Sequence, residues 1–230
     1  MDWISFYDFK HSVIYVNERH RDVHYRTIAE DIRAYVPPHS AKVLDYGCGE
    51  ATSADLVAQT ASHLTLVEAA PNVRAALTAR YAGNVKISVM TPDEALAQPE
   101  GSFDLIVMHS VAQYLTAAEL DRLLGAFHRL VKPDGLVIIG DIVPPSMAAP
   151  AAALSLLHFG YANGFFWAAV GGLIRIFLSD YFRLKKTHGL SHYTEAEMLE
   201  HLKAAGFTAK RAERNIGHNP WRMTFLAGKA

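Results

Sequence analysis

Two carboxylates and a pair of glycines near the start of the chain could together bind a nucleoside. Asp45 stands two residues before Gly47, Gly49 completes a short turn, and Glu68 follows roughly 20 residues later. Glycines allow a tight turn with close approach of the backbone to a ligand. A carboxylate at such a distance can accept hydrogen bonds from both ribose hydroxyls. The pattern predicts a ribose-containing ligand, either a dinucleotide of the NAD type or an adenosyl compound.

The acid at Asp45 distinguishes between these two ligands. A dinucleotide loop directs backbone N–H groups and a helix N-terminus at a pyrophosphate, and a carboxylate two residues before the first glycine would repel that anion. S-adenosylmethionine has no phosphate and carries an ammonium and a sulfonium. The third glycine of the dinucleotide pattern is also missing, because Thr52 occupies its position. These residues favour S-adenosylmethionine over NAD.

Other residues that could do chemistry are more isolated. Cys48 is the single cysteine, and because no base lies near it in the sequence we interpret it as a small loop residue beside the ligand and not as a nucleophile. His109 ends an apolar run and is our choice for a general base. His20 and His24 have the spacing of two metal ligands on one helical face. No third ligand is identifiable, so no metal site is predicted.

Alternating apolar segments would position these residues. The alternation of strands and helices predicts a parallel sheet with right-handed crossovers. Pro92 and Asp93 fall in an expected loop. We expect helices at about 17–36, 52–60, 72–81, 117–130 and 194–205, and strands ending at Leu44 and spanning 64–68, 85–89, 103–108, 136–139, 208–215 and 222–228.

The composition limits the classes of function. With 230 residues, 50% of them hydrophobic, the chain can bury one core and is expected to form a single α/β unit. A net charge of −1 gives no field that would attract DNA or RNA, so nucleic acid is not an expected partner. The single cysteine and the lack of an export signal at the acidic, aromatic N-terminus favour a cytoplasmic location.

An uncharged segment interrupts the second half of the chain. No Asp, Glu, Lys or Arg occurs from 144 to 174. One interpretation is a helical lid buried against the body and a partner subunit. A second is a surface that receives an apolar substrate or contacts a membrane, because 165–167 is aromatic and basic residues follow at Arg175 and beyond. A transmembrane span is the least favoured, since glycines and His158 interrupt the segment.

Several motifs occur in the order and at the intervals of one known family. The chain resembles a class I S-adenosylmethionine-dependent methyltransferase from about residue 40 to its C-terminus, with the apolar segment as an insertion. The order of the motifs is far more specific than any one of them. The resemblance is carried by 45–49 (Asp-Tyr-Gly-Cys-Gly), Glu68, 102–107 (Ser-Phe-Asp-Leu-Ile-Val), 132–136 (Lys-Pro-Asp-Gly-Leu) and 205–207 (Ala-Gly-Phe).

The resemblance implies a fold and a cofactor. The fold would be α/β, a Rossmann-like seven-stranded, mostly parallel sheet with an antiparallel last strand, helices on both faces, an N-terminal helical arm and an apolar helical insertion. S-adenosylmethionine would lie across the C-terminal ends of the first strands. The residues bordering it would be Asp45, Gly47, Cys48 and Gly49 at its methionine portion, Glu68 at its ribose and Ala69 at its adenine.

The residues that follow the third and fourth strands are expected to contribute to the same site. Many members of this family bind the adenine amine with an acid directly after the third strand, where this chain has Met90, Thr91 and Pro92. Asp93 beside Pro92, or backbone groups, would make that contact instead. His109 follows the fourth strand, where the family meets cofactor and substrate together, and it is the expected contact and base.

The resemblance also implies an activity, which is in-line methyl transfer from the cofactor. The uncharged segment 144–174 suggests that the acceptor is a small molecule that is apolar or partly apolar. The arm at 1–38 would close over the cofactor, and the domain would span 39–230 with a lid at about 144–190. The alternatives are a non-catalytic adenosyl-binding protein that regulates or scaffolds a partner and, more weakly, an NAD-dependent oxidoreductase. The segment 144–178 is expected to meet a lipid or membrane surface or to form a homodimer face, which would make a cytoplasmic protein peripheral to a membrane.

Overall fold

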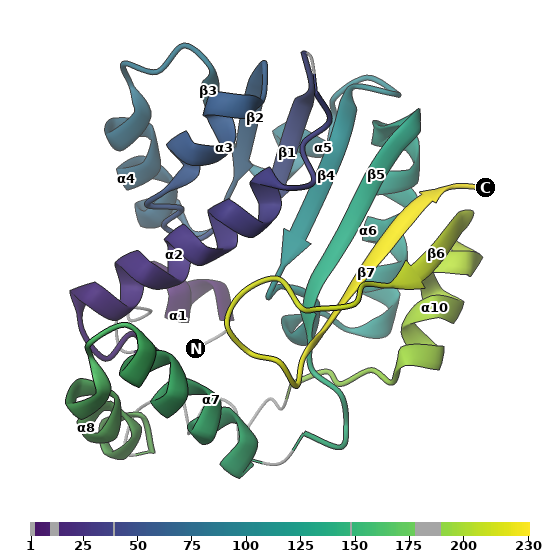
Figure 1. Ribbon diagram of the computed structural model, residues 1–230. Coiled ribbons are helices and arrows are strands. Elements are labelled where there is room, and N and C mark those ends of the chain that lie inside the picture. The colour runs from purple at the N-terminus through teal and green to yellow at the C-terminus, as the bar shows by residue number, and fades with distance from the viewer. Residues whose placement is uncertain (1–2, 10–13, 39, 148, 178–189) are drawn as a thin grey trace.

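A seven-stranded sheet forms the centre of the molecule (Figure 1). The computed structural model describes residues 3–9, 14–38, 40–147, 149–177 and 190–230. The strand order is β3-β2-β1-β4-β5-β7-β6. The strands are β1 (Lys42–Tyr46), β2 (His63–Val67), β3 (Ile87–Met90), β4 (Phe103–His109), β5 (Val131–Ile142), β6 (Phe207–Arg211) and β7 (Met223–Lys229).

The directions of the strands agree with the sequence-based expectation. β1 to β5 pair in parallel, whereas β7 is antiparallel to both β5 and β6. In β4 every residue except Asp104 is buried, which is typical of a parallel strand covered by helices on both faces. The Rossmann-like sheet with an antiparallel last strand is therefore confirmed.

The helices cover both faces of this sheet. Helices α2 (Glu18–Arg33), α3 (Ala54–Thr60) and α4 (Pro71–Tyr81) pack on one face, and α5 (Pro92–Leu96), α6 (Ala117–Leu130) and α10 (Glu195–Ala204) pack on the other. Because side chains alternate along a strand, β4 contributes Leu105 and Val107 to the first core and Ile106 and Met108 to the second.

One expected loop is a helix. Pro92 and Asp93 form the first turn of α5, where the sequence predicted irregular structure. The helix begins there because Thr91 and Glu94 form a capping box: Thr91 Oγ1 accepts from the Glu94 N–H at 3.2 Å, and Glu94 Oε2 accepts from the Thr91 N–H at 2.8 Å. Proline suits the first turn, since its missing N–H would have no partner there.

Two helical additions lie at the same end of the sheet. The arm contributes α1 (Trp3–Phe9) and α2, and the insertion folds into α7 (Ala149–Ala162) and α8 (Phe166–Phe177), which pack against each other beside the start of α2 (Figure 1). Within the described ranges, no helix is long and apolar enough to cross a membrane. The rest of the expected lid, 178–189, lies outside the described residues.

Candidate functional site

The glycine turn after β1 requires its glycines. Gly47 and Gly49 have φ values of 76° and 60°, in the left-handed region that other residues rarely adopt. A Cβ atom on Gly47 would lie 2.3 Å from Cγ2 of Val111, and one on Gly49 would lie 2.6 Å from Oη of Tyr25. The N–H of Gly47 donates to the carbonyl of Val67 at 2.8 Å, so the turn is held against the end of β2.

Glu68 is fixed beside this turn. It follows β2, is 9% exposed and accepts two backbone hydrogen bonds, from the Gly49 N–H to Oε2 at 3.0 Å and from the Ala70 N–H to Oε1 at 2.8 Å. A carboxylate has about four lone-pair positions, so both oxygens keep capacity for further donors. The sequence spacing of Gly49 and Glu68 therefore becomes a direct contact, with an acceptor pair held at the strand end.

Asp45 brings a second carboxylate close to Glu68. Burial, and then the charge of Glu68, raise the pKa of Asp45 to about 7. Two acids that interact in this way favour a cation between or beside them. The site thus has the electrostatic character that a ligand with an ammonium or sulfonium group needs.

Cys48 lies within the same turn, and its thiol is unsuited to attack. It is 8% exposed, and burial followed by the charges of Asp45 and Glu68 raises the pKa of its thiol well above the usual value. The thiolate, which is the reactive form, is therefore disfavoured. Cys48 contributes a small side chain to the wall of the turn.

The residues expected near an adenine lie at the ends of β2 and β3. Val67 and Met90 pair across these strands, so Ala69 and Pro92 follow neighbouring strand ends. The Ala69 carbonyl accepts from Nη1 of Arg74 at 3.1 Å. Burial, then Asp93, then Glu68 raise the pKa of Tyr46, which places the Asp93 carboxylate near the end of β1 as well.

The first helix spans the two sides of this region. On one side, Asp8 accepts from Asn72 of α4, with the backbone N–H at 2.5 Å and Nδ2 at 3.0 Å. On the other side, the Tyr7 hydroxyl lies 2.7 Å from that of Tyr114, in the 3-10 helix η2 (Ala112–Tyr114) after β4. The ring of Trp3 also lies 4.6 Å from that of Tyr114. Helix α1 thus connects α4 with the segment after β4.

His109 is the last residue of β4, and one of its ring nitrogens is hydrogen-bonded. It is 9% exposed, and its Nε2 lies 3.2 Å from the carbonyl oxygen of Ile216. Because a carbonyl can only accept, Nε2 carries the hydrogen and the neutral ring has its lone pair on Nδ1. A proton could be accepted at Nδ1.

A buried polar network that the sequence analysis missed lies next to His109. Asp141, at the end of β5, accepts from Ser110, Arg222 and, at 3.2 Å, Asn215 Nδ2. Burial opposes ionisation, but Arg222, then His109 and Ser110, lower the pKa of Asp141 overall. Ser110 and Asp141 have φ values of 60° and 66°, and such unusual backbone tends to cluster at functional sites. An acid that ends an apolar run, as Glu68 does, was the available signal in the sequence.

The network also holds the loop that carries Ile216. The Asp141 N–H donates to Asn215 Oδ1 at 3.1 Å, Thr224 Oγ1 donates to the same oxygen at 2.8 Å, and the Ile216 N–H donates to Thr224 Oγ1 at 3.0 Å. The position of the carbonyl that meets His109 therefore depends on contacts between β5, β7 and the loop before β7.

Three histidines gather where the arm, the insertion and this loop meet. The ring centroids of His20, His24 and His218 are 5.8 to 6.3 Å apart, and those of His20 and His218 stack on Phe165 at 5.1 Å and Phe159 at 4.2 Å. Burial lowers the pKa of His20 and of His218 to about 4 each. In the part of the chain that the structure describes, no group of three or more such side chains is arranged for a metal ion. His20 Nδ1 accepts from the Val16 N–H, which leaves hydrogen on Nε2.

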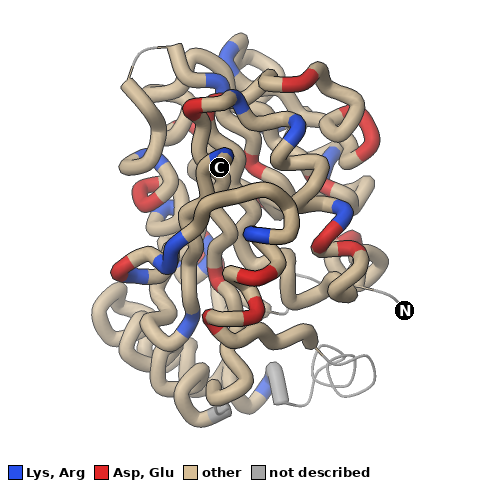
Figure 2. The backbone as a smooth tube through the Cα atoms, turned by 90° about the vertical axis from the view of Figure 1, so that its right-hand side faces the viewer, with Lys and Arg blue, Asp and Glu red and all other residues tan. Residues whose placement is uncertain are grey.

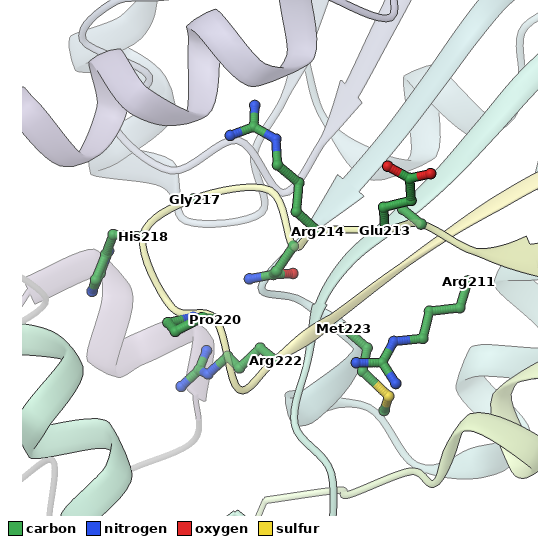
Figure 3. Close-up of a pocket in the computed structure, with 10 residues that line it drawn as sticks. Arg211, Glu213, Arg214, Gly217, His218, Pro220, Arg222 and Met223 are labelled. Carbon is green, nitrogen blue, oxygen red and sulfur yellow. The ribbon is translucent and has the colours of Figure 1, made fainter.

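A separate cavity of about 270 Å³ lies on the loop between β6 and β7 (Figure 3). Its arginines each meet a carboxylate: Arg211 pairs with Glu195 at 3.0 Å, Arg214 pairs with Asp31, and Arg222 pairs with Asp141. Because these charges are compensated, the cavity has little attraction for an anion. The candidate site remains at the C-terminal ends of β1, β2 and β4.

Comparisons with known proteins agree with this architecture. A family model described as a methyltransferase domain matches residues 18–211. A curated relative, an uncharacterized methyltransferase of Synechocystis sp. (strain ATCC 27184 / PCC 6803 / Kazusa), is 30% identical over 111 residues, which are 46% of this chain and 49% of the relative. The chain thus matches about half the length of that relative.

Solved structures share the fold. Magnesium protoporphyrin IX methyltransferase from Synechocystis PCC 6803, solved with bound S-adenosylhomocysteine, has a TM-score of 0.60 and 17% identity, covering 93% of this chain and 88% of that one. A putative methyltransferase in complex with the Haloferax volcanii Trm112 activator has a TM-score of 0.63 and 12% identity, covering 99% and 98%. At these identities the likeness concerns the fold alone.

Proposed function

Because the chain belongs to the methyltransferase-domain family, we propose that it transfers the sulfonium methyl group of S-adenosylmethionine to a small acceptor molecule. The observation that carries the proposal is the pair of carboxylates around the glycine turn. Asp45 and Glu68 offer negative charge and hydrogen-bond acceptors within one short segment, and no phosphate could approach Asp45 without repulsion. A similar fold has been solved with S-adenosylhomocysteine bound, which supports the same choice of cofactor.

In this proposal each part of the site meets one part of the cofactor. Asp45 faces the ammonium of the methionine portion, which would stabilise the charged carboxylate whose pKa is otherwise about 7. Glu68 accepts from the ribose hydroxyls, and Ala69, Pro92 and Asp93 border the adenine. Helix α1 covers the bound cofactor through its contacts with α4 and η2.

The reaction needs alignment more than covalent help. The acceptor atom supplies an electron pair to the methyl carbon while the bond from carbon to sulfur breaks, and the sulfonium becomes a neutral thioether. Holding the two atoms in line and excluding water supply most of the acceleration. Where the acceptor must lose a proton, Nδ1 of His109 accepts it, because Nε2 is held by the Ile216 carbonyl.

An apolar or partly apolar acceptor fits the surroundings of His109. The loop before β7 passes His109 at Gly217, and the next residue, His218, stacks on Phe159 of the insertion, where His20 of the arm stacks on Phe165. The lowered pKa values of His20 and His218 keep both uncharged at neutral pH. These aromatic and uncharged side chains supply no charge that would stabilise a strongly charged acceptor.

Calorimetric titration with S-adenosylmethionine and with NAD tests the cofactor. We expect S-adenosylmethionine to bind and Glu68→Ala to weaken that binding by about 1–3 kcal/mol, since hydrogen bonds to a charged group are lost. Glu200→Ala is the matched control, because Glu200 is exposed on α10. Binding of NAD without S-adenosylmethionine would contradict the proposal. Tight cofactor binding with no transfer of a labelled methyl group to any small molecule of a cell extract would favour the non-catalytic alternative.

A further inference from the structure

The outward faces of α7 and α8 are apolar and exposed. On α7, Leu154 and Tyr161 are 56% and 77% exposed, and on α8, Trp167 and Ile174 are 82% and 64% exposed. The spacings of seven residues within each helix, about two turns, place each pair on one side of its helix. The outward face of a surface helix normally carries charged or polar side chains. Here large apolar side chains occupy most of it, and the exposed polar residue among them is His158, between Leu154 and Tyr161 on α7.

These side chains do not belong to the core of the hairpin. The inward faces of the two helices already pack together through Leu156, Phe159, Phe165 and Ala169, all buried. No Asp, Glu, Lys or Arg occurs from 144 to 174. Figure 2 shows the lower end of the molecule, where Figure 1 places α7 and α8, drawn mostly in tan. The outward face is therefore an exposed apolar patch, of the kind that marks an interaction site.

Two arginines flank this face. Arg19 Nε donates to the carbonyl of Asn163 in the turn between the helices, at 2.5 Å, and Arg175 Nη2 donates to the carbonyl of Tyr15 at 2.9 Å. Within the described ranges neither guanidinium forms an ion pair with a carboxylate. Each therefore retains positive charge at the edge of an uncharged, apolar surface.

We propose that the hairpin of α7 and α8 docks on a lipid bilayer that contains anionic lipids. Leu154 and Ile174 would enter the acyl boundary, Tyr161 and Trp167 would lie at the level of the headgroups, and Arg19 and Arg175 would meet lipid phosphates. The helices lie on the bilayer, since none of the described helices is fit to cross it.

A second copy of the chain fits this face less well. A two-fold dimer would bring the face against itself. The hairpin contributes no acid from 144 to 174 to meet the arginines, so like charges would approach at the rim of the contact. Anionic headgroups instead supply the missing negative charge.

Vesicle flotation of the 230-residue chain tests the proposal. We expect it to float with vesicles of phosphatidylcholine and phosphatidylglycerol, and less with phosphatidylcholine alone. The double variant Trp167→Ser, Ile174→Ser should bind about tenfold more weakly, because apolar area no longer leaves water. Val85→Ser is the matched control, since Val85 is 95% exposed and lies before β3, outside the hairpin.

Further variants separate the two parts of the surface. Arg19→Gln with Arg175→Gln should remove the preference for phosphatidylglycerol, and added salt should do the same. Unchanged calorimetric binding of S-adenosylmethionine would show that each variant is folded. Failure of the wild-type protein to float with either vesicle overturns the proposal. So does a dimer in sedimentation velocity that Trp167→Ser dissociates, because the face would then be occupied by a second copy.

Discussion

The proposed site has two halves, a cofactor side around the glycine turn and an acceptor side around His109, and they are built from contacts of very different range. On the cofactor side, Glu68 meets Gly49, 19 residues away, and the turn itself is local. On the acceptor side, His109 meets Ile216 at a separation of 107 residues, and Asp141 meets Asn215 at 74. The cofactor side is therefore set by short stretches of chain, and the acceptor side exists only when the arm, β5, the insertion and the last loop are assembled.

The same contrast holds for charge. The cofactor side has carboxylates near which a cation is stabilising, whereas the acceptor side buries an acid that Arg222 already compensates and histidines that are kept uncharged. Perturbing the acceptor side should consequently affect folding, and perturbing the cofactor side should affect ligand binding. Four experiments test this division.

The largest of the four effects is expected from low pH, which should destabilise the fold through the buried histidines of the acceptor side. The pKa values of His20 and His218 are lowered from 6.5 to about 4, so the unfolded chain takes up protons first. Their contribution to stability is present above pH 6.5 and is lost as the pH falls towards 4. We expect the two together to reduce the free energy of unfolding by about 4 kcal/mol between pH 7 and pH 5, measured by urea denaturation.

A variant identifies the source of this effect. His20→Gln should remove only the part of the pH dependence that His20 contributes, because His218 and His24, whose pKa burial also lowers well below the usual value, remain. His158→Gln, at an exposed position on α7, should leave it unchanged. Equal pH dependence in wild type and His20→Gln would show that the buried histidines do not control acid stability.

The second largest effect is expected from removing the buried carboxylate of Asp141. Asp141→Ala leaves Arg222, whose side chain is 20% exposed, without its carboxylate partner. We expect a loss of about 3 kcal/mol in the free energy of unfolding, because Arg222, Ser110 and Asn215 lose the buried carboxylate to which they donate. Asp134→Ala, at an exposed position in β5, is the control and should change little. A similar small loss for both variants would count against a structural role for the network.

On the cofactor side, pH should act on binding. The pKa of Asp45 is about 7, and a neighbouring cation favours the ionised form, so affinity for S-adenosylmethionine should rise with pH. We expect about tenfold weaker binding at pH 6 than at pH 8 by calorimetry. Asp45→Asn should bind weakly with little pH dependence. A pH dependence that survives this substitution would assign the titration to another group.

The contact between α1 and η2 should give the smallest effect. Tyr7→Phe removes the hydroxyl that lies 2.7 Å from that of Tyr114. We expect cofactor affinity to fall by about 1 kcal/mol, mainly through faster dissociation in stopped-flow measurements. Tyr161→Phe, at a position that is 77% exposed, provides the control. Identical dissociation rates would mean that α1 does not hold the cofactor in place.

Local patterns account for what could be predicted. The helices expected at 117–130 and 194–205 are found, because apolar periodicity and helix caps act within a few residues. The helix at Pro92 was missed, although Thr91 and Glu94 show a capping pattern. That error concerned a short element whose signal is confined to a single turn.

The network of Asp141 and the position of His218 could not be predicted in the same way. Nothing near Asp141 indicates Arg222 as its partner, since 81 residues separate them. His20 and His24 suggested metal ligands by their spacing, yet the structure packs them with aromatic rings and His218. The outcome depended on which segments the fold brought together.

The sequence by itself determined the sheet, the glycine turn and the acid that stands beside it. Strand periodicity, the left-handed conformations of Gly47 and Gly49, and a fixed spacing to Glu68 need no distant residue. Only the tertiary structure decided the surroundings of His109, the pairing of Asp141 and the apolar outward face of the hairpin. Hydrogen bonds and burial at those places depend on segments far apart in the chain, whose contacts form only when the whole domain folds.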